Sequence, residues 1–87
     1  MNEVLWQQEA VGQLMELSER DPRQARRIRD AVVRYEREGR GDIKRLTGRP
    51  GELRLRVGDW RVLLRVNDQS AHVLVVRVAI RRDAYDD

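Results

Sequence analysis

The chain has 87 residues, with 18 basic and 15 acidic side chains and a net charge of +3, which is enough sequence for one domain and too little for two. It has no cysteine and a single histidine, His72, which disfavours a disulfide framework, a thiolate metal site and a histidine-based catalytic triad. No apolar run approaches the ~20 residues of a membrane span, and the N-terminus lacks a signal-peptide core, so a cytoplasmic protein is expected.

The positive charge is unevenly distributed along the chain. Residues 53–82 hold seven arginines against two acids, Asp59 and Asp68, whereas the first forty residues are nearly balanced. A basic half of this kind is typical of a protein that binds a polyanion. Lys44 is the only lysine, and the arginine fork suits phosphate oxygens. An arginine-biased genome would explain the excess of arginine over lysine equally well. It would not explain why the positive charge is concentrated in the second half of the chain.

A short strand is expected at residues 3–6, followed by two helices. The first helix covers residues 9–18 and the second runs to about residue 38, because apolar residues recur every three to four positions in both. Between them, Asp21 suits the N-cap of the second helix and Pro22 its first helical position. The residues expected to face the core from the two helices are Ala10, Leu14, Leu17, Ala25, Ile28, Val32 and Tyr35.

The apolar period changes from 3.6 to 2 after Ile43, which predicts strands. Gly58-Asp59 fits a two-residue hairpin loop between strands at 53–57 and 60–66. The last strand, at 72–80, is dense in valine and is expected to be central and buried on both faces. The order β-α-α-β-β-β predicts one α+β domain over residues 1–87, with a helix hairpin on one face of a mainly antiparallel four-stranded sheet.

The hairpin loop also predicts which side chains share a face. It sets Val57 opposite Trp60 and Arg56 opposite Arg61, and opposed residues lie on the same side of the sheet. If Val76 and Val78 face the helices, the other face gathers arginines with no acid among them. A solvated polar face is the ordinary alternative for a one-sided antiparallel sheet. The arginines expected on this face are Arg54, Arg56, Arg61, Arg65, Arg77 and Arg81.

Three segments together resemble the RelE branch of the RelE/ParE toxin superfamily. They are residues 44–48 (KRLTG), 53–62 (LRLRVGDWRV) and 81–85 (RRDAY). The order of the predicted elements is also similar, so the resemblance covers almost the whole chain.

The resemblance implies a toxin of a type II toxin–antitoxin system, held in a hetero-oligomer by a cognate antitoxin. Such toxins are ribosome-dependent endoribonucleases that cleave messenger RNA in the ribosomal A site, without a metal or other cofactor. The 2′-hydroxyl of the RNA attacks the adjacent phosphate and leaves a 2′,3′-cyclic end. Two alternatives remain open: a ParE-like toxin that inhibits DNA gyrase without cutting RNA, and a degenerate toxin that only binds nucleic acid.

The resemblance also assigns roles to residues. Arg61 matches the family's phosphate-binding arginine, Arg81 the arginine that stabilises charge and assists the leaving group, and Tyr85 the C-terminal tyrosine that stacks on or activates the nucleotide. Arg54 occupies a position at which members of the family have a catalytic lysine. Glu52 falls at a second lysine, a departure that makes it a base, a holder of a neighbouring cation, or a sign of weaker chemistry. The further residues expected to bind RNA are Lys44, Arg45, Arg56, Arg65, Arg77 and Arg82.

Overall fold

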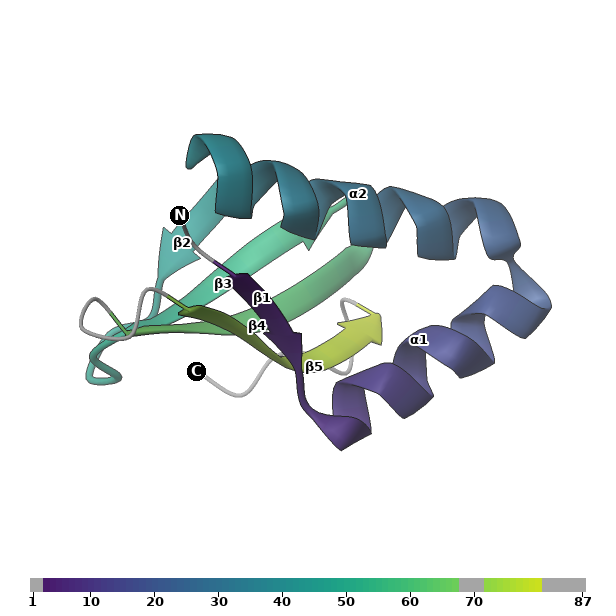
Figure 1. Cartoon of the computed structure of the whole chain (residues 1–87), viewed down its shortest axis with the longest axis horizontal. Coiled ribbons are helices and arrows are strands. Elements are labelled where there is room, and N and C mark those ends of the chain that lie inside the picture. The colour runs from purple at the N-terminus through teal and green to yellow at the C-terminus, as the bar shows by residue number, and fades with distance from the viewer. Residues whose placement is uncertain (1–2, 68–71, 81–87) are drawn as a thin grey trace.

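The computed structural model describes residues 3–67 and 72–80 of the chain. Its sheet has five strands in the order β1-β5-β4-β3-β2, and only the β1–β5 pair is parallel. Two helices form a hairpin over one face of this sheet (Figure 1). The elements are β1 (Glu3–Trp6), α1 (Gln8–Arg20), α2 (Pro22–Glu38), β2 (Asp42–Arg45), β3 (Glu52–Val57), β4 (Trp60–Asn67) and β5 (His72–Ile80).

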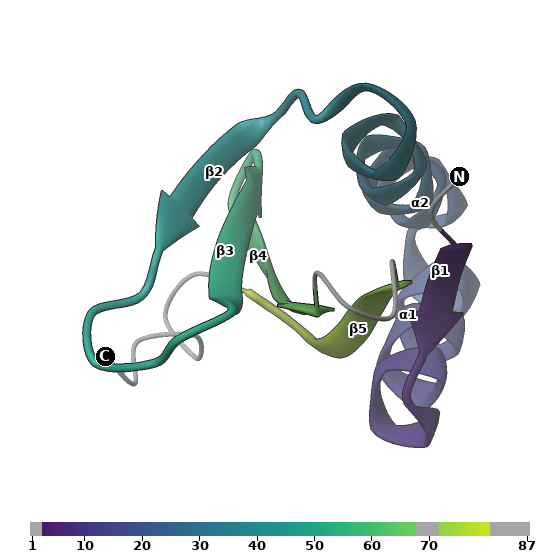
Figure 2. The ribbon, with the colours of Figure 1, turned by 60° about the vertical axis from the view of Figure 1, so that its left-hand side comes forward.

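The predicted α+β class is confirmed, but the predicted number of strands is wrong. Residues 42–45 form a short edge strand that pairs with β3, and this strand was not predicted. Three of its four residues are charged, so it carries no apolar alternation, and the pairing with β3 determines its conformation. Figure 2 shows β2 at the edge of a strongly twisted sheet, on the opposite side from β1 and α1.

The junction between the helices follows from three residues. The N–H of Gln24 donates to Oδ1 of Asp21 over 3.1 Å, so Asp21 caps α2 as predicted. Pro22 occupies the first helical position, where a missing N–H costs nothing. Gly39 ends α2 with a φ of 69°, a left-handed conformation that glycine adopts without strain. No helix in the described part of the chain is long and apolar enough to span a membrane.

A single hydrophobic core lies between the helix hairpin and the sheet. Of the predicted stripes, Leu14 and Tyr35 are half-buried and pack against the core, and the other five residues are buried in it. Val11 and Met15, beside the stripe on α1, are exposed. The buried cluster contains Ala10, Leu17, Ala25, Ile28, Val32, Leu53, Leu55, Val57, Val62, Leu64, Val73, Val75 and Val78.

The β3–β4 hairpin has the predicted register. Val57 lies opposite Trp60, Arg56 opposite Arg61 and Arg54 opposite Leu63. Gly58 has a φ of 60°, as the first position of a type II′ turn requires. The apolar residues of both strands therefore face the helices, and the arginines face the other way.

Strand β5 differs from the prediction in two respects. Its register against β4 shifts between Leu63 and Leu64, so that Val76 is an extra residue with no partner on β4. The residues of β5 that face the helices are consequently Val75 and Val78, not Val76 and Val78. The strand lies between β1 and β4, but it is not buried on both faces, because Arg77 and three apolar side chains are only half-buried: Leu74, Val76 and Ile80.

Truncating the centre of α2 tests this core. Ile28 is 0% exposed, and Ile28→Ala should lower the free energy of unfolding by about 2–5 kcal/mol, the usual cost of such a cavity. Met15→Ala on α1 is the control, because Met15 is 62% exposed and its loss should change the free energy by about 0.5 kcal/mol or less. Urea unfolding measures both, and equal losses in the two variants would contradict the assigned core.

Candidate polyanion-binding site

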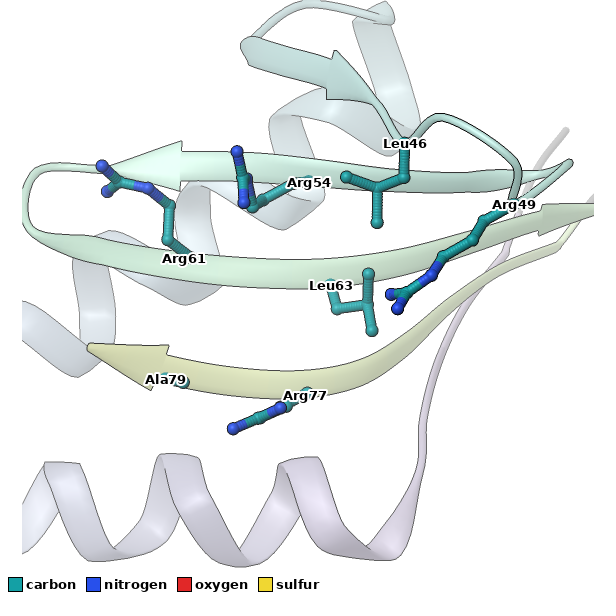
Figure 3. A pocket seen from close by; sticks show the side chains of 7 residues that line it. All are labelled: Leu46, Arg49, Arg54, Arg61, Leu63, Arg77 and Ala79. Carbon is teal, nitrogen blue, oxygen red and sulfur yellow. The ribbon is translucent and has the colours of Figure 1, made fainter. Parts of the chain in front are cut away.

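The open face of the sheet, opposite the helices, carries a shallow depression lined by arginines. We call it the basic hollow. Its free volume is only about 30 Å³, little more than one water occupies. A volume of this size holds no enclosed small-molecule ligand. The lining residues, drawn in Figure 3, are Leu46, Arg49, Arg54, Arg61, Leu63, Arg77 and Ala79.

Strand register brings these side chains together. Arg54 of β3, Leu63 of β4 and Arg77 of β5 form one row across three adjacent strands. The next row runs from Arg56 through Arg61 to Ala79. Neighbouring strands are about 4.8 Å apart, so the backbones of Arg56 and Arg61 lie about 5 Å apart and those of Arg54 and Arg77, with β4 between them, about 10 Å apart. The predicted convergence of Arg54, Arg56, Arg61 and Arg77 on one face is thus what the register produces.

Two hydrogen bonds fix the side chain of Arg61. Its Nη1 donates to the carbonyl oxygens of Gly58 and Trp60, each over 3.0 Å. Arg61 is half-buried. The two bonds hold the guanidinium over the hairpin turn. Three further N–H groups, on Nε and Nη2, belong to the same guanidinium and can point toward an anion.

Lys44 joins the open face from the strand that was not predicted. It lies opposite Arg54 across the β2–β3 pair and is exposed. Glu52 is two residues before Arg54 on β3 and therefore shares its face. It is half-buried and lies opposite Arg65 of β4. An amine and a carboxylate thus stand on either side of Arg54.

The expectation of an open face without acids is wrong. Asp42 lies opposite Arg56, and its Oδ2 is 3.6 Å from Nε of that arginine. Both side chains are more than three-fifths exposed, 62% for Arg56 and 67% for Asp42, so the pair stabilises the fold little. Its effect is to reduce the net charge of the open face at the β2 edge.

Five other predicted residues that the structure describes lie outside the lining of the basic hollow: Lys44, Arg45, Glu52, Arg56 and Arg65. Arg45 lies opposite Leu53, a core residue, and so belongs to the other face of the sheet. Arg65 shares the open face but is not part of the lining. Arg81, Arg82 and Tyr85 lie outside the described residues.

Arg49 is a lining residue that the sequence pattern did not reveal. It sits in the loop 46–51, which folds back over the open face. Backbone bonds fix this loop: Arg49 N–H to Leu46 O at 3.3 Å, and Glu52 N–H to Arg49 O at 3.0 Å. Gly48 and Gly51 have φ of 74° and 79°, and these two glycines were the available sign of a tight double turn.

The fold and the cationic face agree with the results of comparison with known proteins. The sequence profile of the ParE toxins of type II toxin–antitoxin systems (parDE) matches residues 4–85. The chain belongs to this family. It is therefore a toxin of a type II toxin–antitoxin system within the RelE/ParE superfamily. No curated protein matches the sequence.

Solved structures share the fold of the toxin along nearly its whole length. The RelB–RelE antitoxin–toxin complex from Methanococcus jannaschii is 23% identical with a TM-score of 0.74, over 94% of this chain and 95% of that one. The YoeB/ParE toxin from Agrobacterium tumefaciens is 18% identical with a TM-score of 0.77, over 90% and 96%. The RelBE2 toxin–antitoxin complex from Mycobacterium tuberculosis is 29% identical with a TM-score of 0.63, over 91% and 96%.

Removing one arginine of the basic hollow should weaken polyanion binding in a salt-dependent way. For a single strand, each phosphate contact contributes about −0.7 to the slope of log K against log salt concentration, so Arg54→Ala should make the slope shallower by about that amount. Fluorescence anisotropy with a labelled single-stranded polynucleotide at several salt concentrations measures it. Arg23→Ala, on the exposed side of α2, removes the same charge elsewhere. If the slope of log K against log salt concentration falls equally in Arg54→Ala and Arg23→Ala, the polyanion does not bind at the hollow.

Proposed function

We propose that this toxin is a ribosome-dependent endoribonuclease that cleaves messenger RNA in the A site and so inhibits translation, with residues 1–87 acting as one domain in the cytoplasm. The observation that carries the proposal is the meeting of Arg54, Arg61 and Arg77, from three adjacent strands, with Arg49 around one shallow hollow. Four guanidinium groups around one small depression suit a phosphate backbone, because each can donate paired hydrogen bonds to phosphate oxygens.

The first chemical requirement is stabilisation of charge. When the 2′-oxygen attacks the phosphate, the phosphorane gains negative charge beyond that of the diester. Guanidinium groups donate paired hydrogen bonds to phosphate oxygens and remain charged throughout. Arg61, held over the turn by its two bonds to carbonyl oxygens, is fixed before the ligand arrives. Donors fixed in this way need no reorganisation during the reaction, which is why they lower the barrier.

The second requirement is movement of two protons, away from the 2′-oxygen and onto the 5′-oxygen. Arginines are unsuited to this, because they do not deprotonate in proteins. The ionisable residues next to Arg54 on the open face are Lys44, across the β2–β3 pair, and Glu52, two residues earlier on β3. Tyr85, outside the described residues, is the family's candidate for proton transfer, and Arg81, also outside them, is its candidate for stabilising charge at the leaving group. We assign Glu52 a holding role toward Arg54 or Lys44.

The proposed dependence on the ribosome follows from what the chain lacks. With one histidine in the sequence, it has no histidine pair of the kind used by self-sufficient ribonucleases. The ribosome would hold the RNA bent, with the 2′-oxygen in line with the phosphate. Orientation of reacting groups contributes up to about 7–11 kcal/mol in favourable cases.

We further propose a cognate antitoxin as the partner in a hetero-oligomer. The family description includes an antitoxin system, and two of the similar solved structures are toxin–antitoxin complexes. Acidic side chains of such a partner, set on the open face, would relieve the mutual repulsion of its arginines.

Inhibition of DNA gyrase is the second candidate, favoured by the match to the ParE toxin profile. A gyrase inhibitor of the same fold performs no phosphodiester chemistry. It needs a protein-binding surface, and the arginines of the hollow would then be dispensable for toxicity.

The two candidates predict different products in cells. After induction of the wild-type toxin, primer extension on a translated message should show cuts at codon positions, and gyrase supercoiling activity should be unaffected. Arg61→Ala and Arg81→Ala should each reduce cleavage about 10²–10³-fold, the usual cost of one charge-stabilising donor. Arg23→Ala, with the same loss of charge, should still arrest growth. Full toxicity of Arg61→Ala at equal expression, or gyrase inhibition without RNA cuts, would reject the nuclease.

The role of Glu52 can be separated from that of a base by two substitutions. If Glu52 holds a neighbouring cation, Glu52→Gln should lose modestly in cleavage of a programmed ribosome, because the amide still accepts hydrogen bonds. Glu52→Lys should retain or gain activity, since it supplies the residue usual in the family. A collapse of cleavage in Glu52→Gln, with RNA binding unchanged, would instead make Glu52 the base.

A further inference from the structure

Arg77 points to the open face only because β5 contains a bulge. Val73 and Val75 face the core and are 2% and 0% exposed. Simple alternation would continue this face with residue 77 and would bury its guanidinium among valines. The extra residue Val76 changes the phase, so that Val78 is next in the core and Arg77 turns to the hollow. The bulge thus determines whether the arginine of β5, Arg77, lines the basic hollow.

The edge of β5 beyond the bulge is covered by α1. Pairing with β1 ends at Val75, where the N–H of Gln7 donates to the Val75 carbonyl oxygen over 2.9 Å. Further along, α1 contacts β5, as Figure 1 shows at the end of that strand. The N–H of Val78 donates there to Oε1 of Gln13 over 2.6 Å. A helix side chain thus takes the place that a neighbouring strand would fill.

Gln13 is a polar residue in an apolar stripe. It lies three residues after Ala10 and four before Leu17, both buried on the core side of α1. Positions three and four apart share a helix face, so the pattern alone would favour a leucine here. Gln13 is half-buried, and its bond to Val78 accounts for its presence. In the bulged register the Val78 N–H faces α1, whereas simple alternation from Val75 would bring residue 77 to that place.

We propose that Gln13 is a positioning residue for the toxin's site: by accepting the Val78 N–H, it holds β5 in the bulged register that turns Arg77 toward the basic hollow. Gln13 touches no ligand in this account and acts only through Arg77. This role concerns the orientation of the Arg77 side chain. It rests on the proposed function only in the test that measures RNA binding.

The first test measures the register directly by NMR and needs no RNA. In the wild type, Arg77 side-chain protons should give NOEs to the Leu63 methyl groups, its cross-strand neighbour, and the Val78 amide should exchange slowly. Gln13→Leu should weaken those NOEs and speed Val78 exchange roughly tenfold or more, the effect of losing a buried hydrogen bond. Gln13→Glu, which keeps an acceptor, should resemble the wild type. Unchanged NOEs in Gln13→Leu would overturn the proposal.

The second test asks whether Gln13 acts through Arg77. Affinity for a short single-stranded RNA is measured for Gln13→Leu, Arg77→Ala and the double variant. A positioning role predicts that the double variant is no weaker than Arg77→Ala alone, because both changes remove the same contact. Losses that multiply would overturn it. Gln8→Leu and Gln8→Glu, at an exposed position of the same helix, control for the change in polarity and charge.

Two further outcomes are also decisive. If Gln13→Leu does not fold, Gln13→Met, which has an unbranched chain of similar size and no strong acceptor, replaces it in both tests. Failure of both to fold would overturn the proposal, because Gln13 would then support the whole fold and not the aim of Arg77. A wild type that binds RNA but does not cut it on the ribosome would reject the proposed function and leave the role of Gln13 standing.

Discussion

The register of β3, β4 and β5 is the constraint on which the rest of the molecule depends. Cross-strand pairing sets Leu55 against Val62 and Val62 against Val78, and this apolar row packs under the helices. The same pairing necessarily sets Arg54, Leu63 and Arg77 in a row on the other side. A shift of one residue would exchange the faces, burying guanidinium groups and exposing valines. The packing of the core therefore determines which side chains make up the cationic surface.

An open face of this kind is a compromise between folding and binding. Like charges on neighbouring strands repel, which lowers stability in the free toxin. The Asp42–Arg56 pair reduces the repulsion at the β2 edge, away from Leu63. At the hollow itself the repulsion is relieved most by a bound polyanion or by an acidic partner. The proposed RNA target and the proposed antitoxin would therefore compete for one surface of this toxin.

Much of the fold was predictable because its signals are local. Gly58-Asp59 permits one loop length, which fixes the β3–β4 register and with it the faces of Arg54, Arg56 and Arg61. Asp21-Pro22 likewise fixes the helix junction. The parts that escaped prediction depend on distant contacts. Strand β2 forms because β3 offers an edge, and the bulge at Val76 depends on burial of Val78 and on α1.

In the candidate site, too, the residues that could not be predicted depend on distant contacts. Arg49 reaches the hollow through a loop whose path depends on backbone bonds between Leu46 and Glu52, and no periodicity reports such a path. The position of Lys44 depended on the unpredicted strand β2. The assignments of Arg81, Arg82 and Tyr85 come from family resemblance alone and remain predictions.

The central claim is that the open face between β3 and β5 is where this toxin meets RNA, and chemical-shift mapping tests it most directly. The toxin, labelled with ¹⁵N and titrated with a short single-stranded RNA at low salt, should show its largest shifts at Arg49, Arg54, Arg61, Leu63 and Arg77, with little change on the exposed side of α2. Shifts concentrated at Arg26 and Arg29 of α2, with the hollow unaffected, would contradict the account.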